Sequence, residues 1–180
     1  SDWSSDVCSS DLDLMTIREK FGSFSGLKMC FIGDGNNMAN SLIVGGLKVG
    51  MNVAVATPDG YKPDGAVLEF TKGYGDKFAL ETDPFMAASG ADILITDTWT
   101  SMGEEAEKEE RKKIFKDYQI NRQLLAAANA GAMVQHCLPA YRGQEITEEV
   151  FEEHADEIFN EAENRLHAQK AVMVKMMKKD

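Results

Sequence analysis

The sequence lacks the features of several large classes of protein. It has three cysteines (Cys8, Cys30 and Cys137), an odd number with no CxxC pair, so we predict free thiols in a reducing compartment rather than a disulfide framework. Lys and Arg number 19 against 30 Asp and Glu, and the net charge of −11 would repel nucleic-acid phosphates and anionic membranes. No apolar run approaches the ~20 residues that a membrane helix needs, and the first residues lack a signal-peptide pattern. We therefore predict a cytoplasmic protein that binds neither nucleic acid nor membrane.

Residues 1–12 differ in composition from the rest of the chain. Five are serine and three are aspartate, and the segment resembles translated adapter sequence. Such a segment cannot bury enough apolar surface to offset the entropy lost on ordering. We expect residues 1–12 to be a non-native or disordered leader, and residues 13–180 to form one domain.

Beyond the leader, segments of strand length alternate with helical patterns. Strands are predicted at 28–32, 51–56, 78–80, 91–96 and 132–136, and helices at 13–22, 37–47, around 67–74, 104–116, 122–129 and 161–177. The run 91–96 is continuously apolar, as expected for a strand that helices cover on both faces. The fold class predicted is α/β, an open and mostly parallel sheet with helices on both faces, a Rossmann-like three-layer domain. In such sheets ligands bind beyond the carboxyl ends of the strands.

The turn Gly33-Asp34-Gly35 follows the first predicted strand and leads into a helix. It resembles a dinucleotide-binding G-x-G-x-x-G fingerprint, but Met38 stands where the third small residue belongs, and Asp34 would place a carboxylate near the pyrophosphate. Asp59, after the second strand, is weak support for a ribose contact. Nicotinamide-cofactor binding is therefore the less favoured interpretation.

Two asparagines after this turn offer a different interpretation. Asn36 is suited to cap the helix, and on its own that structural role is favoured. Together Asn36 and Asn37 place amides at a helix start, where backbone N–H groups and the helix dipole favour a carboxylate.

Polar side chains also follow the strand at 91–96. Asp97 at the strand end could bind an ammonium group, and Ser101 could add a hydroxyl contact; the alternative for Asp97 is a helix cap, although it lies too far upstream for a simple one. Met102 in the same loop could cover the aliphatic part of a ligand.

The last predicted strand ends in His136-Cys137-Leu138. Cys137 could be a nucleophile, proton acceptor or polar contact, or simply a small buried hydrophobe. Because neighbouring side chains on a strand point to opposite faces, a catalytic pair of Cys137 with His136 is not expected. The three histidines lie far apart in the sequence without ligand spacing, so we predict no metal site.

An acid-rich segment precedes the last helix. Residues 144–163 hold nine acids and no Lys or Arg, which favours a solvated helix face. The charged helix at 104–116, with acid-first i,i+4 pairs, is likewise predicted to be solvated. Arg165 has Glu161 four residues before it, and is either half of a surface ion pair or a ligand for an anion.

Taken together, four segments resemble ornithine carbamoyltransferase in order and spacing. They are Gly33-Asp34-Gly35-Asn36-Asn37 with Asn40-Ser41, Asp97-Thr98-Trp99 with Ser101-Met102-Gly103, His136-Cys137-Leu138-Pro139, and Glu161-Ala162-Glu163-Asn164-Arg165. The match runs from about Asp13 to Met177 and resembles the second, ornithine-binding half of that family's enzymes.

The resemblance implies transfer of the carbamoyl group from carbamoyl phosphate to L-ornithine, giving L-citrulline and phosphate in arginine metabolism, with no metal or organic cofactor. By the family pattern, Asn37 would contact the backbone end of ornithine. Asp97 and Ser101 would hold its side-chain ammonium, and Met102 would lie along the substrate.

The resemblance also implies a catalytic set of Asp97, Cys137 and Arg165. Cys137 would sit at the reacting amine as proton acceptor or orienting group. The backbone of Cys137 and Leu138 would touch carbamoyl phosphate, and Arg165 would polarise the carbamoyl group and stabilise charge on its oxygen.

The family's other half carries a Ser-x-Arg-Thr-Arg phosphate loop and a His-Pro-x-Gln motif, and neither occurs in these 180 residues. We therefore expect a fragment without the carbamoyl-phosphate domain, inactive alone, from an enzyme that the resemblance implies is a trimer-based homo-oligomer. Val172, Val174 and Met176 on the last helix are expected to be exposed. Two alternatives stay open: another transcarbamoylase, with putrescine or an acylated ornithine as acceptor, and a binding-only amino-acid domain.

Overall fold

A five-stranded sheet forms the centre of the computed structural model, which describes residues 3–100 and 107–178, with side chains from Leu12 onward. The strands are β1 (Lys28–Ile32), β2 (Asn52–Ala56), β3 (Phe78–Glu81), β4 (Ile93–Thr96) and β5 (Met133–His136). They run in the order β3-β2-β1-β4-β5, and each pairs in parallel with its neighbours. The predicted open parallel sheet is confirmed.

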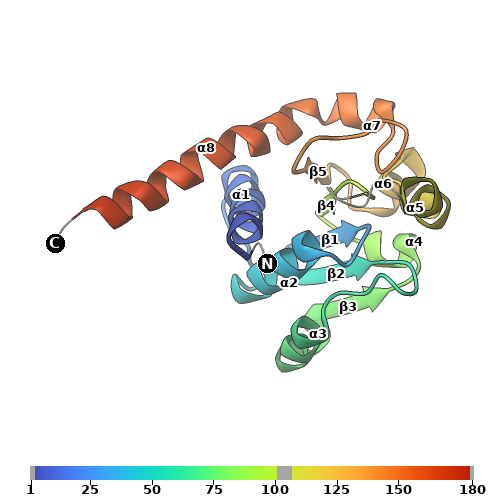
Figure 1. Cartoon of the computed structure of the whole chain (residues 1–180), viewed down its shortest axis with the longest axis horizontal. Helices are drawn as coiled ribbons and strands as arrows, with labels where there is room; N and C mark the ends of the chain where they lie inside the picture. The colour runs from blue at the N-terminus through green and yellow to red at the C-terminus, as the bar shows by residue number, and fades with distance from the viewer. Residues whose placement is uncertain (1–2, 101–106, 179–180) are drawn as a thin grey trace.

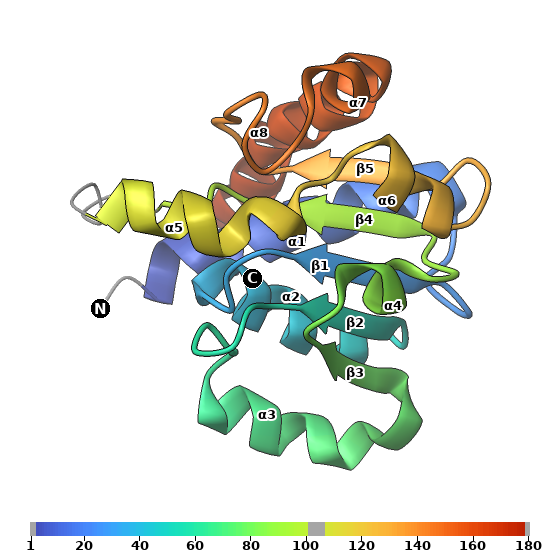
Figure 2. The ribbon, with the colours of Figure 1, turned by 90° about the vertical axis from the view of Figure 1, so that its right-hand side faces the viewer.

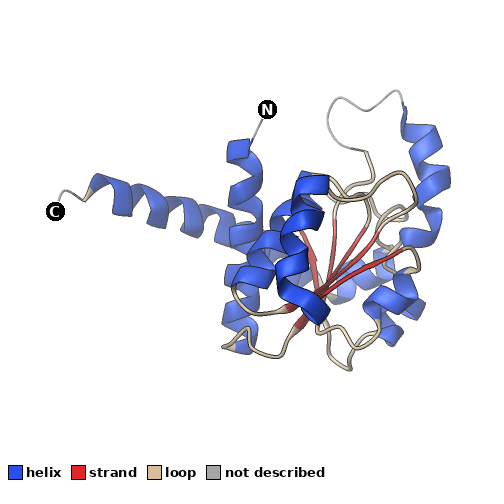
Figure 3. Cartoon of the chain, turned by 90° about the horizontal axis from the view of Figure 1, so that it is seen from below, coloured by secondary structure: helices blue, strands red, loops and turns tan. Residues whose placement is uncertain are grey.

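Helices cover both faces of this sheet, so the domain has three layers (Figure 3). The α-helices are α1 (Trp3–Phe21), α2 (Asn37–Lys48), α3 (Gly65–Thr71), α4 (Pro84–Ala88), α5 (Lys108–Phe115), α6 (Arg122–Ala127), α7 (Glu148–Glu153) and α8 (Ala155–Met177). Two 3-10 segments, η1 (Lys72–Lys77) and η3 (Lys116–Tyr118), follow α3 and α5. Figure 1 shows α8 passing α1 and extending away from the body of the domain.

The core divides into two clusters because strand side chains alternate between the faces. On β1, Met29 and Phe31 pack with α1 and α2, whereas Cys30 and Ile32 pack with residues of α4, α6 and α7. Every position of β4 and β5 is buried, as is every position of β1 and β2 after the first, whereas β3 at the edge is only partly buried. Burial on both faces explains why β4 is a continuous apolar run rather than an alternating one.

The start of the chain differs from the prediction. Residues 3–12, for which no regular structure was predicted, continue α1, and Leu12 is buried. Extending a helix already nucleated at 13–21 adds one hydrogen bond for each residue fixed, so a poor sequence can still be helical there. That the leader is foreign to the domain stays a prediction.

Two charged segments are also less solvated than predicted. Helix α5 was expected to be a solvated helix, but it buries Arg111 and Phe115. The acid-rich segment forms α7 and the first turns of α8, and it buries Glu145 and Glu161. Ion pairing and hydrogen bonding make these burials possible, and neither is visible in a one-dimensional charge pattern.

The far end of α8 fits its prediction: Val172, Val174 and Met176 are 53%, 55% and 82% exposed. Among the residues that the structure describes, no helix has the length and apolarity to cross a membrane.

Candidate functional site

The strand order reverses between β1 and β4, and the polar loops that the sequence singled out lie at the carboxyl ends of these strands and of β5. Figure 2 shows the strands side by side with their arrowheads at one edge. Loops on either side of such a switch point diverge and leave a crevice, so this edge is where a ligand is expected.

The Gly33-Asp34-Gly35 turn is already occupied by protein. A Cβ on Gly35 would lie 2.4 Å from backbone atoms of Tyr61, Lys62 and Pro63, so the glycine is required by a close approach of this chain to itself. The Gly35 N–H donates to the Tyr61 carbonyl oxygen at 2.8 Å. This geometry argues against a dinucleotide pyrophosphate in the turn.

The carboxylate in this turn, Asp34, has a partner within the protein. Its carboxylate pairs with the guanidinium of Arg111, which is 4% exposed and whose Nε donates to the Trp99 carbonyl oxygen at 2.5 Å. The guanidinium also lies 5.0 Å from the ring centre of Tyr61, so one buried cation joins the loops after β1, β2 and β4.

The two asparagines have separate roles. Asn36 is the N-cap of α2, and its side-chain oxygen accepts the Met38 N–H at 3.0 Å, which confirms the capping interpretation. Asn37 is the first residue of α2 and its side chain is exposed, so it is available to a ligand.

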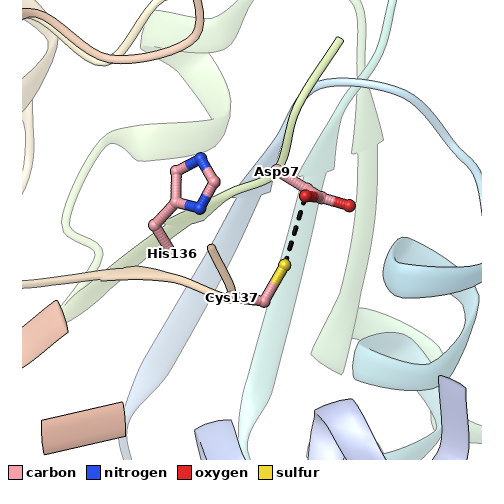
Figure 4. Close-up of side chains that lie close together, drawn as sticks. All are labelled: Asp97, His136 and Cys137. Atoms are coloured by element: carbon pink, nitrogen blue, oxygen red, sulfur yellow. Dashed lines mark hydrogen bonds between the residues drawn. The ribbon is translucent and has the colours of Figure 1, made fainter. Parts of the chain in front are cut away.

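Asp97 and Cys137 meet at the centre of this edge. The Cys137 thiol donates to Asp97 Oδ1 at 3.1 Å, as Figure 4 shows. Burial and then the charge of Asp97 raise the pKa of Cys137 well above its ordinary value, so the sulfur carries its proton at neutral pH. A protonated thiol is a poor nucleophile or base, and its free lone pairs can still accept a hydrogen bond.

His136 lies beside this pair but its ring nitrogens bond to other groups (Figure 4). Its Nδ1 accepts the Leu138 N–H at 2.9 Å, and its Nε2 lies 3.1 Å from Glu145 Oε1, so the proton is on Nε2 and Glu145 accepts it. Leu138 has φ of 56°, an uncommon conformation for leucine, which the hydrogen bond to His136 helps to hold.

Asp97, His136 and Cys137 each place one potential metal-ligand atom within 4.8 Å of the others. However, both ring nitrogens of His136 are engaged, and a metal ion there would break the hydrogen bond to Leu138 or to Glu145. The donor set therefore does not favour a metal.

Arg165 reaches the same edge from α8. Its guanidinium is exposed and donates to the Cys137 carbonyl oxygen at 3.3 Å, so of its two interpretations the one in which it faces the site is favoured. Asp97, Cys137, Leu138 and Arg165 thus lie together, whereas Ser101 and Met102 fall outside the described residues.

The sequence interpretation missed three buried carboxyl groups behind this cluster. Glu145 supports His136, Glu161 accepts the His136 N–H at 3.0 Å, and Asp13 on α1 lies against Glu161. Glu145 and Glu161 were hidden inside a run of acids, and Asp13 looked like a helix start. Only the absence of Lys and Arg from residues 144–163 marked the segment as unusual.

Comparisons with known proteins give one consistent set of relatives. Residues 25–176 match the family model described as the Asp/Orn binding domain of aspartate/ornithine carbamoyltransferase. Among curated proteins, an ornithine carbamoyltransferase from Gloeobacter violaceus is 55% identical over 174 residues, which are 94% of this chain and 56% of that relative. One from Methanocorpusculum labreanum is 49% identical, with the same two coverages.

Solved structures give the same result. Ornithine carbamoyltransferase from Pyrococcus furiosus superposes with a TM-score of 0.84 at 46% identity, over 92% of this chain and 54% of that one. An N-acetyl-L-ornithine transcarbamylase is more distant, with a TM-score of 0.75 at 25% identity over 92% of this chain and 55% of that one. The chain thus spans about half the length of the relatives that it matches.

Proposed function

The chain belongs to the aspartate/ornithine carbamoyltransferase family, and we propose that it is the acceptor-binding domain of an ornithine carbamoyltransferase. In the proposed reaction the side-chain amine of L-ornithine attacks the carbonyl carbon of carbamoyl phosphate, and L-citrulline and phosphate leave. The observation that carries the proposal is the meeting of Asp97, Cys137 and Arg165 at one edge of the sheet.

The three groups have complementary tasks. Asp97 offers a carboxylate to the side-chain ammonium of ornithine, and Cys137 lies beside that carboxylate. Because the pKa of Cys137 is raised, we assign it the task of orienting the amine rather than accepting its proton. Arg165 would polarise the carbamoyl oxygen and stabilise the negative charge that develops on it; its contact with the Cys137 carbonyl oxygen supports this role.

The remaining contacts complete the acceptor site. Asn37 would bind the backbone end of ornithine, Ser101 its side-chain nitrogen, and Met102 its methylene chain. The backbone of Cys137 and Leu138 would face carbamoyl phosphate, and the left-handed conformation of Leu138 fixes where its carbonyl points. The amine must lose a proton before it attacks, so binding next to Asp97 must be followed by deprotonation.

Titration of the 180-residue chain with ligands at millimolar concentration tests the acceptor assignment. We expect L-ornithine to shift backbone amide resonances near Asp97 and Cys137, and putrescine and NAD to leave them unmoved. Asp97→Asn should abolish the ornithine shifts, while Asp59→Asn, at an exposed carboxylate after β2, should leave them intact. Shifts with NAD that Asp59→Asn removes would overturn the proposal in favour of a dinucleotide site.

An acylated acceptor is the second candidate, because an N-acetyl-L-ornithine transcarbamylase has the same fold. Among the solved structures, the higher identity to an ornithine enzyme, 46% against 25%, favours the free amino acid. A larger response to N-acetyl-L-ornithine than to L-ornithine would reverse this choice.

We further propose that these 180 residues alone have little or no transferase activity, because the phosphate-binding motifs of the family do not occur in them. A citrulline assay with saturating ornithine and carbamoyl phosphate tests this, and robust turnover would contradict it. The trimer-based assembly and the cytoplasmic location stay predictions.

A further inference from the structure

Strand β5 is at the edge of the sheet, and two glutamates of α8 complete its hydrogen bonding. Met133 N–H donates inward to the carbonyl of Asp92 on the β4 side, so the N–H groups of Val134 and His136 face away from the sheet. Glu157 accepts the first at 2.9 Å and Glu161 accepts the second at 3.0 Å. Glu161 therefore holds the backbone immediately before Cys137.

The second oxygen of Glu161 faces a carboxyl group instead of a donor. Asp13 on α1 and Glu161 are 0% and 1% exposed, and their carboxyl groups interact directly. No N–H or O–H group of another described residue donates to either oxygen of Asp13 or to Oε1 of Glu161, so the two carboxyl groups have only each other. Since two ionised carboxylates only accept hydrogen bonds, the buried contact requires at least one proton between them.

Four other charged or titratable groups act on this pair or are acted on by it. They are Asp97 after β4, His136 and Cys137 at the end of β5, and Arg165 one turn further along α8. Burial, followed by the charge of Glu161, raises the pKa of Asp13 well above its ordinary value. Burial also raises the pKa of Glu161 to about 7, although the hydrogen bond with Asp13 opposes the rise.

We propose that Asp13 and Glu161 form a proton-holding pair that positions the His136–Cys137 backbone and releases one proton when a cationic acceptor side chain binds beside Asp97 and Cys137. The inference rests on the proposed function and adds a linked proton to it. A pair that carries two protons is neutral; binding of the cation favours the ionised form, one proton passes to the buffer, and the other stays between the two carboxyl groups. Both residues are positioning residues, since neither is placed to touch the substrate.

Calorimetric titration of the 180-residue chain with L-ornithine tests this, at pH 6 to 8 in two buffers with different ionisation heats. We expect release of up to about one proton at pH 6 and none at pH 8, with affinity rising by up to about tenfold per pH unit below pH 7. The amino groups of ornithine stay protonated over this range, and L-norvaline, which lacks the side-chain ammonium, should bind without proton release.

Substitutions test whether the released proton comes from Asp13 and Glu161 rather than from another group. Glu161→Gln keeps an oxygen for the His136 N–H and gives an amide donor for Asp13, so binding should persist without proton release. Asp13→Asn should do the same, because its amide keeps Glu161 ionised at pH 6. Glu163→Gln, at an exposed glutamate of the same helix that pairs with His167, is the control and should behave as wild type.

The outcomes are distinguishable. Ornithine binding by the wild type without buffer-dependent heat would overturn the proton-holding pair alone, as would release that both Glu161→Gln and Asp13→Asn retain. Failure of the wild type to bind ornithine at all would overturn the proposed function and this inference together.

Discussion

Replacing Glu157 by glutamine should measurably destabilise the fold at neutral pH. Its carboxylate joins three elements: Oε2 accepts the Val134 N–H of β5 at 2.9 Å and lies 2.8 Å from His154 Nδ1, and Oε1 pairs with Lys20 of α1. Burial alone would raise the pKa of this carboxyl. The hydrogen bonds from His154, Lys20 and Val134 outweigh burial and lower the pKa from 4.5 to about 2.

The size of the effect follows from this difference in pKa. A drop of about 2.5 units between unfolded and folded states corresponds to about 3 kcal/mol of stability, and the side chain is 23% exposed, so solvent screening removes a small part of it. Because the folded-state pKa is lowered, the stabilisation is complete above about pH 4.5 and is lost as the pH falls toward 2. At pH 3 roughly half of it should remain.

Urea unfolding of wild type and Glu157→Gln at pH 7 and pH 3 measures the effect. We expect the variant to lose about 2–3 kcal/mol at pH 7 and about half of that at pH 3. Glu153→Gln, at a glutamate 47% exposed and paired with Arg122, is the matched control and should change stability by less than about 0.5 kcal/mol. A loss below about 1 kcal/mol at pH 7, or an equal loss at both pH values, would refute the reasoning.

Three further predictions concern single contacts. Gly35→Ala must push its methyl group against the backbone of residues 61–63, and should lower the free energy of unfolding by roughly 1–3 kcal/mol in thermal melts; an unchanged Tm would show that this loop yields freely. Asp97→Asn removes a negative charge beside Cys137, so the pKa of the thiol should fall and iodoacetamide should alkylate it faster, and slower alkylation would contradict this. Tyr118→Phe deletes the hydroxyl that donates to the Thr82 carbonyl at 2.6 Å, and should cost about 1 kcal/mol in urea unfolding, whereas a neutral result would mean that water replaces the bond.

Much of the fold was predictable from local patterns. The run 91–96 is apolar because both faces of β4 are covered. The start of α4 is likewise a local pattern, because Asp83 accepts the Phe85 N–H at 2.8 Å and Pro84 occupies the first turn. These patterns are local, because apolar periodicity and helix capping each depend on residues only a few positions apart. They located all five strands to within two residues at each end.

The sequence predicted the residues that face the site, but not the buried residues that hold them in position. Asp97 and Cys137 were found because polar groups at the carboxyl ends of parallel strands gather at one edge. The burial of Arg111 depends on Asp34, 77 residues earlier, and that of Glu161 depends on Asp13 and on an edge strand. Contacts between distant segments decide which charges of an acid-rich or basic helix are buried, and no spacing rule within the helix carries that information.

The edge position of β5 explains why α8 can serve the site at all. An interior strand would have its N–H groups paired on both sides, and a helix beside it could pack only through apolar contacts. Because β5 is at the edge, Glu157 and Glu161, one turn apart, accept alternate N–H groups of the strand and fix the helix in register with it. Arg165 follows Glu161 by one helical turn, and Cys137 follows His136 by one residue. The same register therefore brings the Arg165 guanidinium to the Cys137 carbonyl oxygen. A helix turned by one residue would lose both glutamate contacts and move Arg165 off the site, so the buried acids of α8 are required for the position of its exposed base.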